Sequence, residues 1–166
     1  LENRVRGDYS QVSSGFQNEV RGDYAGISGG QENRVSGTLS SISGGSGNQV
    51  DGDGSVIGGG SGNKVAGMYG VIGGGELNKV SGLYSGVFEG YGNEVDGDGS
   101  VIGGGIGNEI TGYGSVISGG EENRSEGRYS VIGGGSDNAV RAAYGVINGG
   151  EGSRVTGEYG VVVGGL

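Results

Sequence analysis

Two short polar motifs recur in this chain, and each has residue types that could bind a partner or an ion. The tripeptide Arg-Gly-Asp, which integrin-type receptors read, occurs as Arg6, Gly7 and Asp8 and as Arg21, Gly22 and Asp23. The tripeptide Asp-Gly-Asp occurs at 51–53 and 96–98. Its two carboxylates are separated by one glycine and could hold a hard cation weakly. The two Arg-Gly-Asp copies begin 15 residues apart. This spacing leads from the motifs to the elements that carry them.

A 15-residue period runs through the whole sequence. Asparagine recurs at this interval from Asn3 to Asn138, and Ser153 takes the last place. The repeat is N-x-V-x-G-x-Y-S-V-I-G-G-G-x-x, and below its positions are counted from the asparagine. Such a unit is too short for two helices and a turn, so it predicts one coil of a parallel β-solenoid. We therefore expect one all-β domain over residues 1–166, with eleven coils and a length of about 50 Å.

The composition excludes several function classes. The chain has no His and no Cys, so it lacks the usual general base, the thiolate nucleophile and the commonest metal ligands. The net charge of −9 argues against binding to nucleic acid or to an anionic membrane. No apolar run is long enough to insert into a bilayer. We expect a protein that is not an enzyme and that has no catalytic residue, cofactor or metal site.

Neither end of the array has a capping segment, although solenoids usually need caps. The expectation is a piece of a longer fibrous protein, or a unit that stacks end to end.

Alternation along two expected strands assigns side chains to the core or to the surface. In the first strand, over positions one to six, the third position is Val or Ile except at Ser125 and is expected to face inward. Positions two, four and six carry most of the charge and are expected to face solvent. In the second strand, over positions seven to eleven, the eighth and tenth positions face inward. The glycine pair that follows makes a corner, and the repeated asparagines are expected to form a hydrogen-bonded ladder.

The outward side of the second strand is apolar, because Val is frequent at position nine and Tyr at position seven. A strand that is apolar on both sides needs cover on both. The sequence therefore predicts an oligomer interface along this stripe. Its residues are Val56, Val71, Val101, Val116, Val131, Val146, Val161, Tyr69, Tyr84, Tyr129, Tyr144 and Tyr159.

Segments such as GRYSVIGGGSDNAV and GDGSVIGGGSGNKV resemble the head repeats of trimeric autotransporter adhesins, the YadA-like head family. The resemblance covers all eleven coils. It implies a left-handed parallel β-roll, three rolls packed about a threefold axis as a homotrimer, and an extracellular place on a bacterial cell surface. The family's matching positions are scaffold, so no functional residue is carried over.

The resemblance and the composition favour an adhesin head that binds extracellular matrix or other surface components through a repeated rigid face. A structural filament or a phage-type fibre segment is the alternative. An ice-binding solenoid is a further alternative, but Thr occurs only at 38, 111 and 156, never in neighbouring coils.

The repeat itself accounts for the Arg-Gly-Asp copies. Glycine occupies position five in all coils but one, Arg position four in three coils and Asp position six in four, which predicts about one copy by chance. Within a strand the motif would also be poorly presented to a receptor. For the Asp-Gly-Asp segments, a solvated face is favoured over a cation site.

Overall fold

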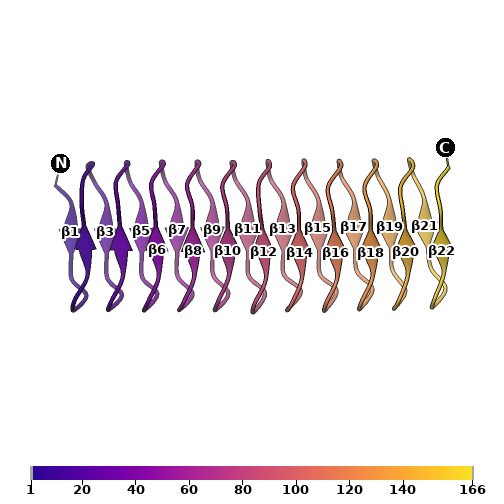
Figure 1. The fold of residues 1–166 in the computed structure, drawn as a ribbon, viewed down its shortest axis with the longest axis horizontal. Helices are drawn as coiled ribbons and strands as arrows, with labels where there is room; N and C mark the ends of the chain where they lie inside the picture. The colour runs from indigo at the N-terminus through magenta and orange to yellow at the C-terminus, as the bar shows by residue number, and fades with distance from the viewer. Residues whose placement is uncertain (1, 166) are drawn as a thin grey trace.

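The computed structural model describes residues 2–165, and this part of the chain contains strands but no helix. Each coil contributes two strands of two residues, and these form two parallel sheets of eleven strands each. Figure 1 shows the coils side by side along one long axis, with the N-terminus at one end of the rod and the C-terminus at the other. The predicted all-β parallel solenoid of eleven coils is confirmed.

The first sheet, sheet A, contains the odd-numbered strands of positions two and three. They are β1 (Arg4–Val5), β3 (Glu19–Val20), β5 (Arg34–Val35), β7 (Gln49–Val50), β9 (Lys64–Val65), β11 (Lys79–Val80), β13 (Glu94–Val95), β15 (Glu109–Ile110), β17 (Arg124–Ser125), β19 (Ala139–Val140) and β21 (Arg154–Val155).

The second sheet, sheet B, contains the even-numbered strands of positions nine and ten. They are β2 (Gln11–Val12), β4 (Gly26–Ile27), β6 (Ser41–Ile42), β8 (Val56–Ile57), β10 (Val71–Ile72), β12 (Gly86–Val87), β14 (Val101–Ile102), β16 (Val116–Ile117), β18 (Val131–Ile132), β20 (Val146–Ile147) and β22 (Val161–Val162).

The core is a narrow double row of branched aliphatic side chains between the sheets. Every strand except the last of each sheet pairs with the strand 15 residues on, as Val50 pairs with Val65 and Ile57 with Ile72. The core residues at positions three and ten are therefore stacked on their own kind, and most are fully buried. The inward assignment of these two positions is confirmed.

Serine at position eight also faces inward, and its hydroxyl is fully used. Ser55 is buried; its Oγ donates to the carbonyl of Gly67 at 2.8 Å and accepts from the amide of Gly70 at 3.0 Å. A buried hydroxyl without partners would destabilise the core, whereas here Ser55 joins its coil to the next.

The repeated asparagines form the predicted ladder. The Asn108 side-chain amide donates to the carbonyls of Gly104 at 3.1 Å and Gly120 at 2.9 Å, and its Oδ1 accepts from the backbone amide of Asn123 at 3.0 Å. Asn108 is fully buried. The ladder thus satisfies buried backbone groups at the corner that follows the glycine pair.

One expectation about local structure was wrong. The predicted strands of five or six residues are only two residues long, because the chain turns sharply at positions five to seven. Position seven has a positive φ, 56° at Tyr69 and 53° at Tyr84, and Gly54 takes the same conformation with φ 64°. The tyrosines therefore lie in a turn rather than in the second strand. Stacking offsets the backbone strain, since the rings of Tyr69 and Tyr84 lie 4.9 Å apart and 5° from parallel.

A third ladder, which the sequence did not predict, runs along the rod. Isolated parallel bridges join position fourteen of neighbouring coils, for example Ser46 to Ser61 and Tyr91 to Ile106. Residue identity varies widely at this position, so no side-chain pattern marked it. The bridges hold the corner after the recurring glycines in the same register as the sheets.

Ser125 offers a test of the core. It is fully buried where ten other coils have Val or Ile, and its hydroxyl bonds to Ser130. Ser130 keeps a bond to the carbonyl of Gly127 at 2.9 Å without it. We expect Ser125→Val to raise the free energy of unfolding by about 1 kcal/mol, because it restores the buried methyl groups. Urea unfolding checks this, and a less stable variant would show that this coil is packed around the serine pair.

Candidate functional site

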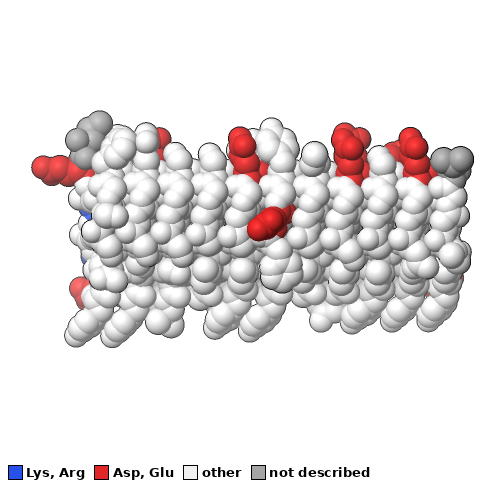
Figure 2. Space-filling view, turned by 45° about the horizontal axis from the view of Figure 1, so that its top comes forward, with Lys and Arg blue, Asp and Glu red and all other residues white. Residues whose placement is uncertain are grey.

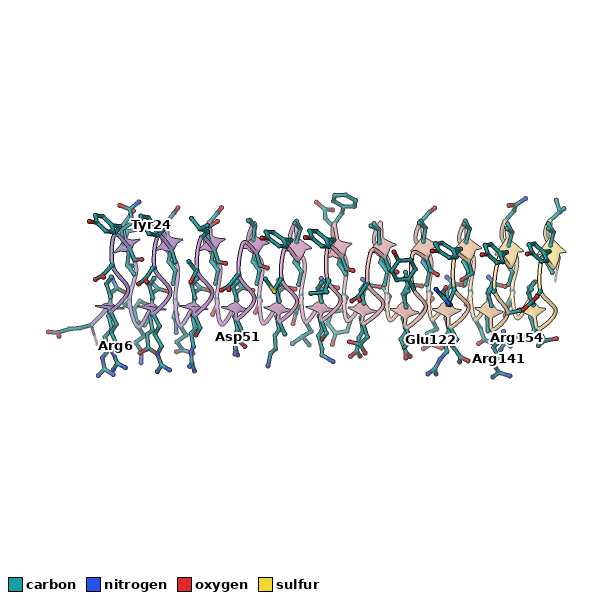
Figure 3. The ribbon with its side chains drawn as sticks, turned by 90° about the horizontal axis from the view of Figure 1, so that it is seen from below. Arg6, Tyr24, Asp51, Glu122, Arg141 and Arg154 are labelled. Carbon is teal, nitrogen blue, oxygen red and sulfur yellow. The ribbon has the colours of Figure 1, made fainter. Side chains whose placement is uncertain are left out.

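The two sheets present chemically different faces to solvent. Nine of the ten Lys and Arg residues occupy positions two or four, on the outward side of sheet A or just after it. On the outward side of sheet B, position nine carries only Val, Gly, Gln or Ser. Figure 2 shows one long face of the rod that is almost free of charged side chains, with acidic side chains along one edge. In Figure 3, Tyr24 lies on the opposite side of the rod from Arg6, Asp51 and Arg141.

Positions two, four and six face outward as predicted, and all but one of their residues are exposed or half-buried. Arg21 and Asp51 are exposed and Glu94 is half-buried, while Ala139 at position two is buried.

The valines of the predicted stripe lie in one row on the outward side of sheet B, and we call them the valine row. Val71 and Val131 are 40% and 39% exposed, Val101 and Val146 are half-buried, and the last, Val161, is 63% exposed. Neighbouring coils cover the flanks of each side chain, so the exposed part is its outward tip. The row comprises Val56, Val71, Val101, Val116, Val131, Val146 and Val161.

The tyrosines of the stripe border the valine row along the sharp turn. Tyr69, Tyr84, Tyr129, Tyr144 and Tyr159 are all exposed. Tyr129 stacks on Tyr144 with ring centroids 5.5 Å apart, and Tyr144 on Tyr159 at 5.0 Å. The valine row is interrupted at Gly86, and the resulting apolar depression is lined by Tyr69, Val71, Tyr84, Phe88 and Val101 among others. The role of the valine row and these tyrosines as an oligomer interface remains a prediction.

The sequence predicts that the Arg-Gly-Asp copies lie within a strand. In the structure they do not. In each copy, Arg follows the end of a sheet A strand, and Gly and Asp enter the sharp turn. Gly22 is buried, and a Cβ placed there would lie 2.1 Å from the carbonyl oxygen of Gly37. The Asp23 carboxylate accepts a hydrogen bond from the backbone amide of Asp8 at 2.8 Å. The glycine thus has a structural role that the repeat requires, and Asp23 is engaged in a hydrogen bond between coils.

The arginines of both copies lie beside one glutamate. Glu19 contacts Arg21 at 2.9 Å and Arg6 at 3.7 Å. The hydrogen bond from Arg21 is the main cause that lowers the pKa of Glu19, against a smaller opposing effect of burial. The bond therefore stabilises the fold at neutral pH, and this contribution is lost as pH falls through the lowered pKa.

The Asp-Gly-Asp segments are engaged by neighbouring groups. Asp53 accepts from the amide of Thr38 and Asp98 from that of Leu83, each at 2.8 Å. Asp51 accepts from the Gln49 side chain, and Asp96 lies 3.7 Å from the Lys79 ammonium. Within residues 2–165, no three Asp, Glu, His or Cys side chains gather closely enough to hold a metal ion.

The stacked coils and their continuous ladders define the chain as a parallel β-solenoid repeat protein. No model of a known protein family matches the chain, and a search of curated proteins found no match. In residues 2–165 there is no helix of the length and apolarity needed to cross a membrane.

Proposed function

We propose that this protein is a non-enzymatic adhesive head or spacer of the cell surface, which works as a homotrimer. The observation that supports this proposal is the contrast between the two faces of the rod. Sheet B is uncharged on its outward side and carries the valine row, while nearly all cations lie on the side of sheet A. A long row of exposed apolar side chains of this kind is typical of an interface.

The assembly buries the valine row and leaves the charged face outside. The core covers sheet B on its inward side only. Packing of rods side by side through sheet B would cover its outward side as well and would add to the small amount of apolar surface that each coil buries in the core. The number of three chains rests on the resemblance to adhesin heads, because the valine row by itself requires only a partner of like surface.

Adhesion through such a rod is distributed over many weak contacts. The repeat places similar side chains at a fixed spacing, and three chains multiply them, so avidity replaces a deep binding pocket. Collagen, fibronectin and other extracellular surface components are the expected ligands.

The test is adhesion of the intact protein to collagen, fibronectin and whole cells, before and after Asp8→Asn with Asp23→Asn. Asparagine keeps the side-chain oxygen that Asp23 offers to the Asp8 amide, while both receptor motifs are destroyed. We expect most adhesion to remain. Abolished binding by a folded variant would contradict distributed adhesion and make Arg-Gly-Asp the true ligand.

A structural filament or fibre segment is the second candidate, supported by eleven coils without a break in either ladder. If the protein binds no surface component, the structural filament is the better-supported function. We expect no thermal hysteresis, because an ice-binding face needs a regular array and no two threonines lie in neighbouring coils.

A further inference from the structure

The first three coils carry a compact group of arginines on the face of sheet A. Arg4, Glu19 and Arg34 occupy one row across β1, β3 and β5, because their strands pair in register. Arg6 and Arg21 lie two residues further along in a second row. These five residues are called the arginine patch, and Figure 3 shows Arg6 projecting from this side of the rod.

The arginine patch has more positive charge than its one acid can balance. Glu19 is shared by Arg21 at 2.9 Å and Arg6 at 3.7 Å. Arg34 donates to the Ser36 hydroxyl at 3.3 Å. Within residues 2–165, neither Arg4 nor Arg34 has an acidic oxygen within ion-pair distance. Four arginines against one glutamate leave a surplus of three positive charges on this face of a protein whose net charge is −9.

Acidic side chains surround the arginine patch without pairing with it. Glu2 and Glu32 lie on one side and Asp8 and Asp23 on the other, and no arginine contacts them within ion-pair distance in the described residues. Charges at this separation are partly screened at physiological salt.

Two arginines near the other end of sheet A, Arg124 and Arg154, differ because each contacts an acidic side chain closely. Arg124 contacts Glu109 at 3.1 Å and Glu126 at 2.8 Å. Arg154 contacts Asp137 at 2.9 Å. An approaching anion would have to displace these carboxylates, whereas Arg4 and Arg34 keep free donors.

We propose that the arginine patch binds sulfate or carboxylate groups of an acidic glycan. The planar guanidinium matches the geometry of such oxyanions and binds them with two parallel hydrogen bonds. This inference rests on the proposed adhesive function and names one class of surface partner. It also gives the Arg-Gly-Asp arginines a role that does not involve their aspartates.

Glycan chemistry fits this face better than nucleic acid or a membrane does. Single-stranded nucleic acid is usually held by stacking on aromatic side chains. Positions two and four of all eleven coils carry no aromatic and no apolar residue larger than Ala. A membrane surface would require apolar side chains to insert, and these are likewise missing from this face. Ser36 and Gln49, by contrast, offer polar groups to sugar hydroxyls beside the arginines.

The experiment measures the Kd of the intact, assembled protein by calorimetry. The probes are a heparin-derived oligosaccharide, an oligouronate, neutral dextran and a single-stranded oligonucleotide of matched charge, at low and physiological salt. The test variant is Arg4→Gln with Arg34→Gln. The matched control is Arg124→Gln with Arg154→Gln, which removes the same charge from the same sheet.

We expect an acidic oligosaccharide to bind and the test variant to lose affinity by about tenfold or more, while the control changes by less than about twofold. Glu19→Gln should bind more tightly, because it removes the competing carboxylate. Equal losses of affinity in the test variant and the control would show that binding depends only on net charge, and this would overturn the proposal. Equal or tighter binding of the oligonucleotide would overturn the glycan assignment.

The failure of this proposal and the failure of the adhesive function are distinguishable. If adhesion to matrix and cells survives Arg4→Gln with Arg34→Gln and no acidic glycan binds, the arginine patch is not a site but the adhesive function stands. If the oligosaccharide binds through Arg4 and Arg34 but no surface is bound, the patch stands and the adhesive function falls.

Discussion

Replacement of Val101 and Val131 by aspartate is expected to split the assembly into single chains or to unfold it. Both side chains lie in the valine row on the outward side of sheet B, where Val131 is 39% exposed in the single chain. In a trimer these tips are covered, and the two carboxylates would be buried without partners, which costs several kcal/mol. In a monomer the same change meets water and is tolerated.

The control is Ala66→Asp with Thr156→Asp, which adds the same charge at two exposed positions on the other face. Sedimentation velocity and urea unfolding are measured for both variants at one protein concentration. The control should keep the mass and the stability of the parent chain. If the valine variant also keeps both, the valine row is not an interface.

Alanine at Gly75 is expected to destabilise the fold strongly, while alanine at the adjacent Gly74 is not. Gly75 has φ 88°, and a Cβ there would lie 2.1 Å from the Gly90 carbonyl oxygen and 2.7 Å from the Asn78 amide nitrogen. Relief of that overlap would have to break both the coil-to-coil contact and the asparagine ladder. The expected loss in the free energy of unfolding is about 3 kcal/mol or more.

Gly74 is a close control because a Cβ placed there meets nothing within 4 Å. Its replacement should change the free energy of unfolding by less than about 0.5 kcal/mol. Urea unfolding of the two variants at equal protein concentration makes the comparison. Similar stabilities would show that the coils can separate locally without loss, contrary to the close stacking described above.

The 15-residue period made most of the architecture predictable from the sequence. The fixed spacing of asparagine implied coils in register. The aliphatic side chains at positions three and ten implied two ladders with a shared core, and both follow from period and alternation alone. The prediction failed at position seven, because tyrosine is a good strand residue by propensity. The one sign of a turn with positive φ in the sequence is that glycine replaces tyrosine at this position in three coils, as Gly54, Gly99 and Gly114.

The charged surface was predictable only in part. Alternation gave the correct outward positions, but it could not show which charges neutralise each other. Arg124 and Arg4 occupy the same repeat position, yet only Arg124 has acids within reach in the described residues. That difference depends on the residues one coil away and on side-chain directions. The arginine patch therefore emerged from the structure and not from the motif.

The Arg-Gly-Asp copies show that a repeat can contain a receptor motif by chance, without any need for receptor binding. Gly22 is held by the close approach of the Gly37 carbonyl, and Asp23 by the Asp8 amide. The glycine and Asp23 are thus engaged in contacts within the coils, whereas the arginine side chains lie on the solvent-exposed face. We therefore look for binding at the arginines rather than at the tripeptide.

The mass of the folded protein in solution tests the central claim most directly. Analytical ultracentrifugation at micromolar concentration should find three chains of 16.3 kDa each, about 49 kDa. Circular dichroism of the same sample should show β-structure. A stable, folded species of 16.3 kDa would contradict the interface on sheet B and the trimeric head with it.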